Sequence, residues 1–151
     1  AIVSFNAEAT VLAPLTANRG VLGKALDGLT TARGSRLDKG IRAATAILGA
    51  TPPDTIRLMA AVTDGEIDES LRSATVGAGD AARALGIGLH VVGIGADPNN
   101  TMMMAVAGDS GYYHVAPDAE DIGRIFHDLS FLPPPCPGAF WPASAPTRTL
   151  R

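Results

Sequence analysis

The sequence predicts an α/β fold with a mostly parallel central sheet, one antiparallel edge hairpin and flanking helices. Short apolar segments rich in Val and Ile alternate with stretches in which apolar residues recur at helical spacing. Glycine and proline residues separate these segments. A hairpin followed by alternating helices and strands is the order expected of a sheet whose parallel strands are joined by helices.

The N-terminal third of the chain predicts a β-hairpin and then two helices. Segments 1–5 and 9–12 are rich in Val, Ile, Phe and Thr, and the turn residues Asn6 to Glu8 separate them. Two apolar stripes at helical spacing follow, on either side of the break at Gly34. The stripes consist of Val21, Leu22, Ala25, Leu26 and Leu29, and of Leu37, Ile41, Ala44 and Leu48.

The middle of the chain predicts two strands joined by a helix. Pro52 and Pro53 end the second helix, because proline lacks an amide donor and disfavours helical geometry in the residue before it. The run 56–62 carries one charge and suits a strand covered on both faces. A helical stripe over 71–85 ends at Gly86, and the strand 89–94 follows.

The remaining residues predict one more helix, strand and helix and then a tail. A short helix over 98–107, a strand over 112–115 and a helix over 118–129 complete the domain, which spans residues 1–130. Residues 131–151 are rich in proline, which forbids a regular helix or a central strand. We expect this tail to have no direct role; docking of Phe131, Phe140 and Trp141 on the domain or on a partner is the alternative.

Composition excludes several classes of protein. The net charge is −3 and no basic stripe exists, so nucleic acid is not an expected partner. Apolar runs such as 88–94 fall far short of the roughly 20 residues that cross a bilayer. The single cysteine, Cys136, cannot form an internal disulfide, so cysteine usage does not indicate whether the protein works in an oxidising or a reducing compartment.

Three segments resemble the von Willebrand factor type A domain. The hairpin region 3–16 looks like the second and third strands of that family. The apolar segment 58–66, which contains Thr-Asp-Gly, and the segment 86–95 resemble its next two strands, and they are the most specific signals. Segment 107–116 and the helix after it are similar to the closing strand and helix. The resemblance runs from residue 1 to about residue 129 and implies the Rossmann-like fold of the family.

The resemblance also implies a metal-ion-dependent adhesion site at the C-terminal ends of the parallel strands. In the family, three loops supply its ligands: an Asp-x-Ser-x-Ser motif after the first strand, a Thr or Ser hydroxyl before a helix, and the Asp of Thr-Asp-Gly. Ser35 matches the second loop and Asp64 the third. No Asp-x-Ser-x-Ser occurs here, so we expect a domain truncated at its N-terminus that lacks the first strand and first helix.

The resemblance therefore implies a metal-dependent protein-binding module for adhesion or assembly. Mg²⁺, or alternatively Mn²⁺ or Ca²⁺, prefers oxygen ligands and retains water, so an acidic side chain of a protein partner can complete its coordination. With Ser35 and Asp64 as the two side-chain ligands, we expect metal binding to be weak or absent unless the missing loop is supplied.

Each proposed ligand also has a local alternative. Ser35 fits a helix N-cap to which Asp38 returns a bond, and Asp64 fits a turn aspartate before Gly65. The loop acids Glu66 and Asp68 are expected to be solvated and to lie outside the site. The histidines predict no zinc site: His90 is expected to be a core residue, and His114 and His127 have no Cys or His at zinc-like spacing.

Two competing functions remain. The first is a metal-independent structural or assembly module that uses the sheet edge and the Pro-rich tail, since loss of a central strand favours aggregation, self-association or recruitment of a strand from a partner. The second, less favoured, is a nucleotide-binding or hydrolytic enzyme. Gly93 and Gly95 lack the third glycine of a dinucleotide fingerprint, Gly34-Ser35 lacks the lysine of a phosphate loop, and no Gly-x-Ser-x-Gly occurs. We therefore predict that the protein is not an enzyme.

Overall fold

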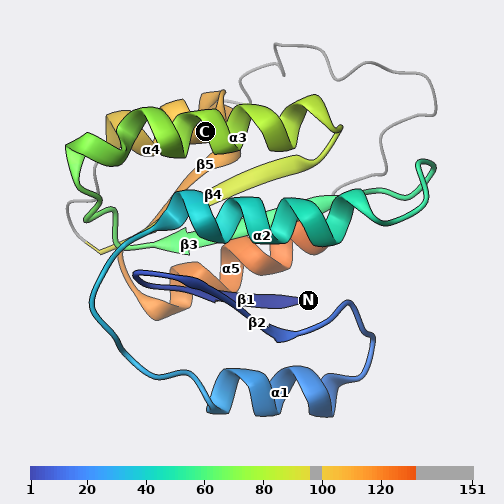
Figure 1. The fold of residues 1–151 in the computed structure, drawn as a ribbon. Coiled ribbons are helices and arrows are strands. Elements are labelled where there is room, and N and C mark those ends of the chain that lie inside the picture. The colour runs from blue at the N-terminus through green and yellow to red at the C-terminus, as the bar shows by residue number, and fades with distance from the viewer. Residues whose placement is uncertain (96–99, 132–151) are drawn as a thin grey trace, which may run out of the picture.

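The computed structural model describes residues 1–95 and 100–131, and its helices and strands follow one another in the predicted order (Figure 1). The strands are β1 (Ile2–Phe5), β2 (Ala9–Ala13), β3 (Leu58–Thr63), β4 (Gly88–Ile94) and β5 (Tyr113–Ala116). The α-helices are α1 (Arg19–Asp27), α2 (Leu37–Gly49), α3 (Arg72–Ala84), α4 (Asn100–Ala107) and α5 (Ala119–Ser130). Two short 3-10 helices are η1 (Glu69–Leu71) and η2 (Ser110–Tyr112). The proline-rich tail predicted for 131–151 lies, after residue 131, outside the described residues.

The strands form two separate sheets among the described residues. β3, β4 and β5 pair in parallel with β4 in the middle, and β1 pairs with β2 as an antiparallel hairpin. The α/β class, the parallel sheet and the hairpin are therefore confirmed. The five residues from Leu89 to Gly93 in β4 are all buried, which explains why this strand is apolar apart from His90 and does not alternate with exposed polar residues.

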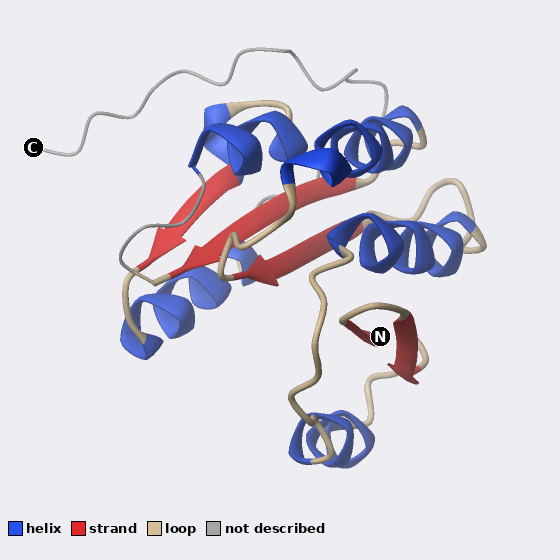
Figure 2. Ribbon diagram, turned by 60° about the vertical axis from the view of Figure 1, so that its left-hand side comes forward, coloured by secondary structure: helices blue, strands red, loops and turns tan. Residues whose placement is uncertain are grey.

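Helices cover both faces of the parallel sheet (Figure 2). On one face, side chains of α2, α3 and α4 pack with β3 and β4 into the larger core. On the other face, Ile125 and Leu129 of α5 pack against Val92 and Ala116. Met102 and Met103 of α4 are fully buried in the larger core, whereas Met104 is 39% exposed.

Local side chains determine where several helices begin and end. The side chain of Asn18 accepts hydrogen bonds from the backbone amides of Gly20 and Val21 at the start of α1. Asp118 does the same at the start of α5, where its negative charge also suits the helix dipole. Gly86 follows α3 with a φ of +72°, as predicted for a glycine that ends a helix.

Helix α1 differs from the sequence prediction in its packing. The helix forms, but none of its residues is buried, and Leu26 and the nearby Leu29 are 54% and 49% exposed. Their side chains line an open groove between the hairpin and the parallel sheet instead of a closed core. No helix within 1–95 or 100–131 is long and apolar enough to span a bilayer.

Candidate metal centre

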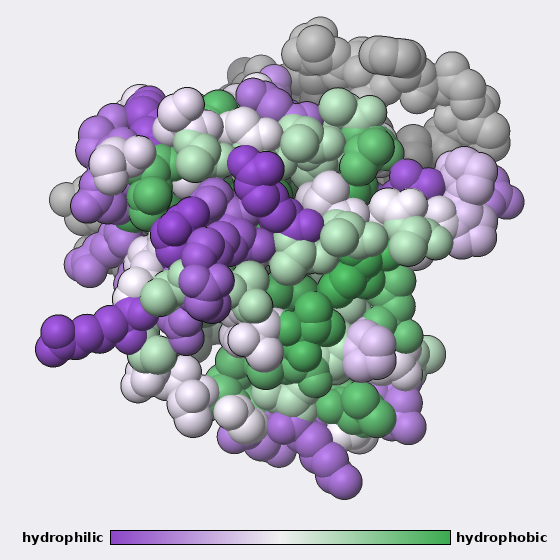
Figure 3. All heavy atoms as spheres, in the orientation of Figure 1, coloured by the Kyte–Doolittle hydropathy of each residue, from purple (hydrophilic) through white to green (hydrophobic). Residues whose placement is uncertain are grey.

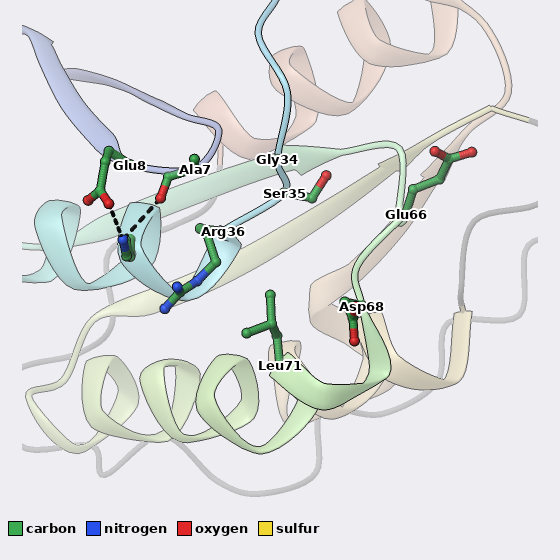
Figure 4. Close-up of a pocket in the computed structure, with 9 residues that line it drawn as sticks. Ala7, Glu8, Gly34, Ser35, Arg36, Glu66, Asp68 and Leu71 are labelled. Atoms are coloured by element: carbon green, nitrogen blue, oxygen red, sulfur yellow. Dashed lines mark hydrogen bonds and ion pairs between the residues drawn. The ribbon is translucent and has the colours of Figure 1, made fainter.

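A surface pocket of about 520 Å³ lies where the hairpin turn, the start of α2 and the loop after β3 meet (Figure 4). This is the C-terminal end of β3, the edge at which sheets of this class place their ligands. The pocket is lined by Ala7, Glu8, Gly34, Ser35, Arg36, Lys39, Glu66, Asp68 and Leu71.

Ser35 is held in this pocket by the backbone on both sides of it. Gly34 has a φ of +105°, and a Cβ atom there would lie 2.7 Å from the backbone nitrogen of Ala7, so this approach to the hairpin turn requires glycine. On the other side, the backbone amide of Arg36 donates a hydrogen bond of 2.8 Å to the carbonyl oxygen of Asn6. The Ser35 hydroxyl points toward the loop that carries Glu66 (Figure 4).

The alternative role of Ser35 as a helix cap is wrong. The N-cap of α2 is Arg36, which makes no side-chain cap hydrogen bond. Asp38 does not return a bond to Ser35 because its two carboxylate oxygens accept bonds of 2.7 and 2.8 Å from the Arg36 guanidinium. This ion pair, together with smaller contributions from nearby groups, lowers the pKa of Asp38 from its ordinary value although the side chain is buried.

Asp64 follows β3 directly and takes the turn role predicted for it. Its Oδ1 atom accepts a hydrogen bond of 3.2 Å from the backbone amide of Glu66, across Gly65 with its φ of +80°. Among the described residues, its second carboxylate oxygen has no hydrogen bond of its own. The residue is exposed to solvent.

The loop of Ser35 and the loop after β3 line the same pocket, as predicted. The acidic side chains that line it differ from the predicted one. Ser35 lines the pocket, whereas Asp64 is not among the lining residues; Glu66 and Asp68 from the same loop are. Sequence reasoning placed both of these acids outside the site. Their spacing of two and four residues after a strand-end aspartate was the available signal.

The charges around the pocket are unevenly compensated. The basic residues Arg36 and Lys39 are paired with Asp38 and Glu8. Within the described part of the chain, no basic side chain forms an ion pair with Asp64, Glu66 or Asp68. Hydrogen bonds from the side chain and backbone of Ser70 lower the pKa of Asp68. The loop after β3 is therefore negatively charged and favours a cation.

The chemistry of these groups fits a hard cation with few protein ligands. Carboxylate and hydroxyl oxygens suit Mg²⁺, Mn²⁺ and Ca²⁺, whereas zinc prefers sulfur and imidazole nitrogen. Residues 1–95 and 100–131 contain no group of three or more His, Cys, Asp or Glu side chains that could enclose a metal by themselves.

A histidine pair lies on the sheet, apart from the pocket. His90 Nδ1 and His114 Nε2 are 3.0 Å apart, and the ring of Tyr112 packs against His90. His90 is 4% exposed, as predicted for a core residue, and burial lowers its pKa to about 4. The sequence did not reveal its partner because 24 residues separate the two histidines, which only the pairing of β4 with β5 brings together.

Comparisons with known proteins agree on the fold. The sequence profile of the von Willebrand factor type A domain matches residues 1–128. A search of curated proteins finds no match. The structure is similar to that of the conserved hypothetical protein BatB from Bacteroides thetaiotaomicron, with 19% identity and a TM-score of 0.70, over 85% of this chain and 76% of that chain.

Two further similar structures are of metal-bound proteins. The proximal thread matrix protein 1 of the mussel byssus, with a zinc-occupied MIDAS motif, has 16% identity and a TM-score of 0.70, over 84% of this chain and 32% of that chain. The manganese-loaded TRAP protein of Plasmodium vivax has 20% identity and a TM-score of 0.61, over 78% of this chain and 52% of that chain. At these identities the likeness establishes the fold.

Proposed function

The chain belongs to the von Willebrand factor type A family, and from this membership we propose that it is a metal-dependent protein-binding module for adhesion or assembly. Ser35 and Asp64 would hold a divalent cation, Mg²⁺, Mn²⁺ or Ca²⁺, at the C-terminal end of β3. The partner is a protein that presents an exposed Asp or Glu side chain. The proposal includes no catalytic step.

One observation carries this proposal: the hydroxyl of Ser35 and the acidic loop after β3 share one pocket. Neither element is near the other in sequence, and a close contact of Gly34 with Ala7 holds Ser35 in place. Two structurally similar proteins, the byssus protein with its zinc-occupied MIDAS motif and the manganese-loaded Plasmodium protein, hold divalent metals, which supports a cation in this proposal.

Each side chain has a distinct part in the proposed site. Asp64 uses one oxygen to hold its own turn through the Glu66 amide, which leaves the other oxygen for the cation. The Ser35 hydroxyl offers a neutral oxygen, so the bound cation keeps most of its charge and attracts an anionic partner group. Glu66 and Asp68 raise the local concentration of cations and form the rim that a partner contacts.

Isothermal titration of the protein with MnCl₂ tests the metal site. With two side-chain ligands we expect weak binding, with a dissociation constant of about 1 mM or above. Asp64→Ala should abolish the measurable heat, and Ser35→Ala should weaken binding, because each removes one oxygen.

Asp109→Ala is the matched control. Asp109 also accepts a hydrogen bond from a backbone amide two residues later, that of Gly111, but it lies at η2 and not in the pocket. Its loss should leave the titration unchanged. Equal heats from the wild type and Asp64→Ala would remove Asp64 from the mechanism.

The second candidate function is a metal-independent assembly module. It is favoured by the open apolar groove of about 700 Å³ between the hairpin and the parallel sheet. An oligomer of such a module survives EDTA, whereas complexes formed through the proposed metal site dissociate in it.

A further inference from the structure

β5 forms the outer edge of the parallel sheet, and in the described part of the chain no strand lies beside its outer side (Figure 2). The carbonyl oxygen of Ala116 accepts a hydrogen bond of 3.1 Å from the amide of Gly95, directly after β4. Because the backbone groups of successive strand residues alternate in direction, Ala116 and His114 face β4, whereas Tyr113 and Val115 face outward. The amide of Tyr113 donates within η2. The amide of Val115 and the carbonyls of both outward residues therefore need another partner.

The edge of β5 has none of the features that keep edge strands from pairing. β5 contains no Asp, Glu, Lys, Arg or Pro, and its register with β4 runs without a shift. Tyr113 packs against the larger core, and Val115 lies on the same face two residues later. Val115 is apolar and yet 43% exposed. The edge is therefore regular, uncharged and open to another strand.

We propose that two copies of this chain pair through β5, antiparallel and about a two-fold axis at His114. In this register, Val115 of each copy lies opposite Tyr113 of the other, and the Val115 amide donates to the outward Tyr113 carbonyl. Opposite residues of antiparallel strands point to the same face, so the exposed Val115 side chain packs on a half-buried aromatic ring. The two parallel sheets become one continuous sheet, and both copies use the same surface.

The pattern of β5 selects a second copy as the partner. Its outward residues, Tyr113 and Val115, lie symmetrically about His114, so the strand is complementary to its own reversed copy. The next outward residue is Pro117, which has no amide to donate, so a longer added strand finds no donor there. His114 meets its own copy at the axis, but its Nε2 atom lies 3.0 Å from Nδ1 of His90, so the ring is turned toward β4.

The charges beside this edge are complementary under the same symmetry. The carboxylate of Asp128 in α5 interacts electrostatically with His114, so this face of α5 borders β5. Arg124 lies on the same face one turn earlier, and its side chain is 69% exposed. Reversal of one copy relative to the other brings each Arg124 toward Asp128 of the other copy. The flanking helices therefore offer the dimer charges of opposite sign.

Sedimentation velocity of the protein in EDTA tests the dimer. The edge is short, so we expect weak association with a dissociation constant on the order of 10–100 μM. The wild type should therefore change from monomer to dimer between about 1 and 500 μM. EDTA separates this test from the proposed metal site, on which the dimer does not rest. A wild type that stays monomeric at about 500 μM overturns the proposal.

Three lysine variants at exposed apolar residues locate the interface. Val115→Lys should weaken association by about tenfold or more, because it places a charge opposite Tyr113 of the other copy. Val11 on β2 is 50% exposed, and Phe126 in the open apolar groove is 42% exposed. Figure 3 shows the apolar surface of that groove between α2 and α1. Val11→Lys and Phe126→Lys should each change association by less than about twofold. Association that persists in Val115→Lys overturns the proposal.

Two further variants at the same position test the backbone pairing. Val115→Thr keeps the side-chain shape and the amide, so association should stay within about threefold of the wild type. Val115→Pro removes the outward amide but no hydrogen bond to β4, so association should weaken by about tenfold or more. Circular dichroism checks that all variants fold. In hydrogen exchange, the amide of Val115 should gain protection as the protein concentration rises, and exchange that is independent of concentration contradicts pairing through β5.

Discussion

At the scale of single residues, Asp38 is a buried charged group at the start of α2. It is 3% exposed, and both of its carboxylate oxygens accept hydrogen bonds from the Arg36 guanidinium. Asp38→Ala leaves the guanidinium without its partner at the junction of the hairpin turn and α2. We expect a loss of about 2 kcal/mol in the free energy of unfolding, measured by urea denaturation.

The exposed pair of Asp80 with Arg83 provides the control, since Asp80→Ala should cost less than about 1 kcal/mol. Equal losses in the free energy of unfolding from the two variants would show that burial of the Asp38 ion pair does not contribute to stability. Because the pKa of Asp38 is lowered in the folded state, its contribution is present above the ordinary value of 3.8 and is lost as the pH falls through the folded value.

His90 gives the fold a sensitivity to mild acid. Burial, and then the neighbouring His114, lower its pKa from 6.5 to about 4, so the unfolded chain binds a proton in this range that the folded chain does not. Stability is therefore complete above about pH 6.5 and falls between pH 6.5 and 4, by at most about 3 kcal/mol from this residue.

Urea denaturation at pH 7 and at pH 4.5 measures this loss. His90→Leu should reduce the difference in the free energy of unfolding between the two pH values. A variant at His90 that keeps the full pH dependence would contradict this assignment.

At the scale of elements, two glycines of α3 have opposite expected effects. A Cβ atom on Gly79 would lie 2.5 Å from the carbonyl oxygen of Val106, so α3 and α4 approach closely at that point. Gly77 in the same helix has no atom within 4 Å of such a Cβ. Gly79→Ala should destabilise the protein by about 1–3 kcal/mol, whereas Gly77→Ala should stabilise it by up to about 1 kcal/mol. Thermal denaturation of both variants checks the sign.

The elements themselves could largely be predicted, because apolar periodicity and glycine or proline breaks are local properties. The order of strands and helices and the ends at Asp118 and Gly86 follow from them. The N-cap of α2 could not be predicted. The Arg36 guanidinium binds Asp38, and a capping pattern in the sequence does not encode this contact. The open packing of α1 was also missed, because amphipathic spacing does not say whether a covering element is present.

At the scale of the whole molecule, the sequence predicted that the site lies at the C-terminal edge of the sheet. It did not predict which side chains line the site. Ser35 and the loop of Asp64 were expected to meet because the fold brings strand ends to one edge. That Glu66 and Asp68 rather than Asp64 line the pocket depends on the turn made by Asp64 and Gly65. His90 and His114 meet through strand register, which a single sequence does not reveal.

The division into two sheets predicts uneven protection of backbone amides. Within residues 1–95 and 100–131, β4 lies between two strands and is buried, whereas β1 and β2 pair with each other alone. In native-state hydrogen exchange we expect the amides of β4 to exchange slowest and those of the hairpin fastest. Uniform exchange across both sheets would show that they open as one unit.

The hairpin contacts the main body through Phe5 against Gly40, through the backbone bond of Arg36 to Asn6, and through the bonds of Lys39 to the hairpin turn. The consequence concerns folding kinetics. We expect the three-stranded body to form first and the hairpin to dock after the rate-limiting barrier. In a stopped-flow chevron, Lys39→Ala should accelerate unfolding and leave the refolding rate nearly unchanged, which is the behaviour of a contact formed late.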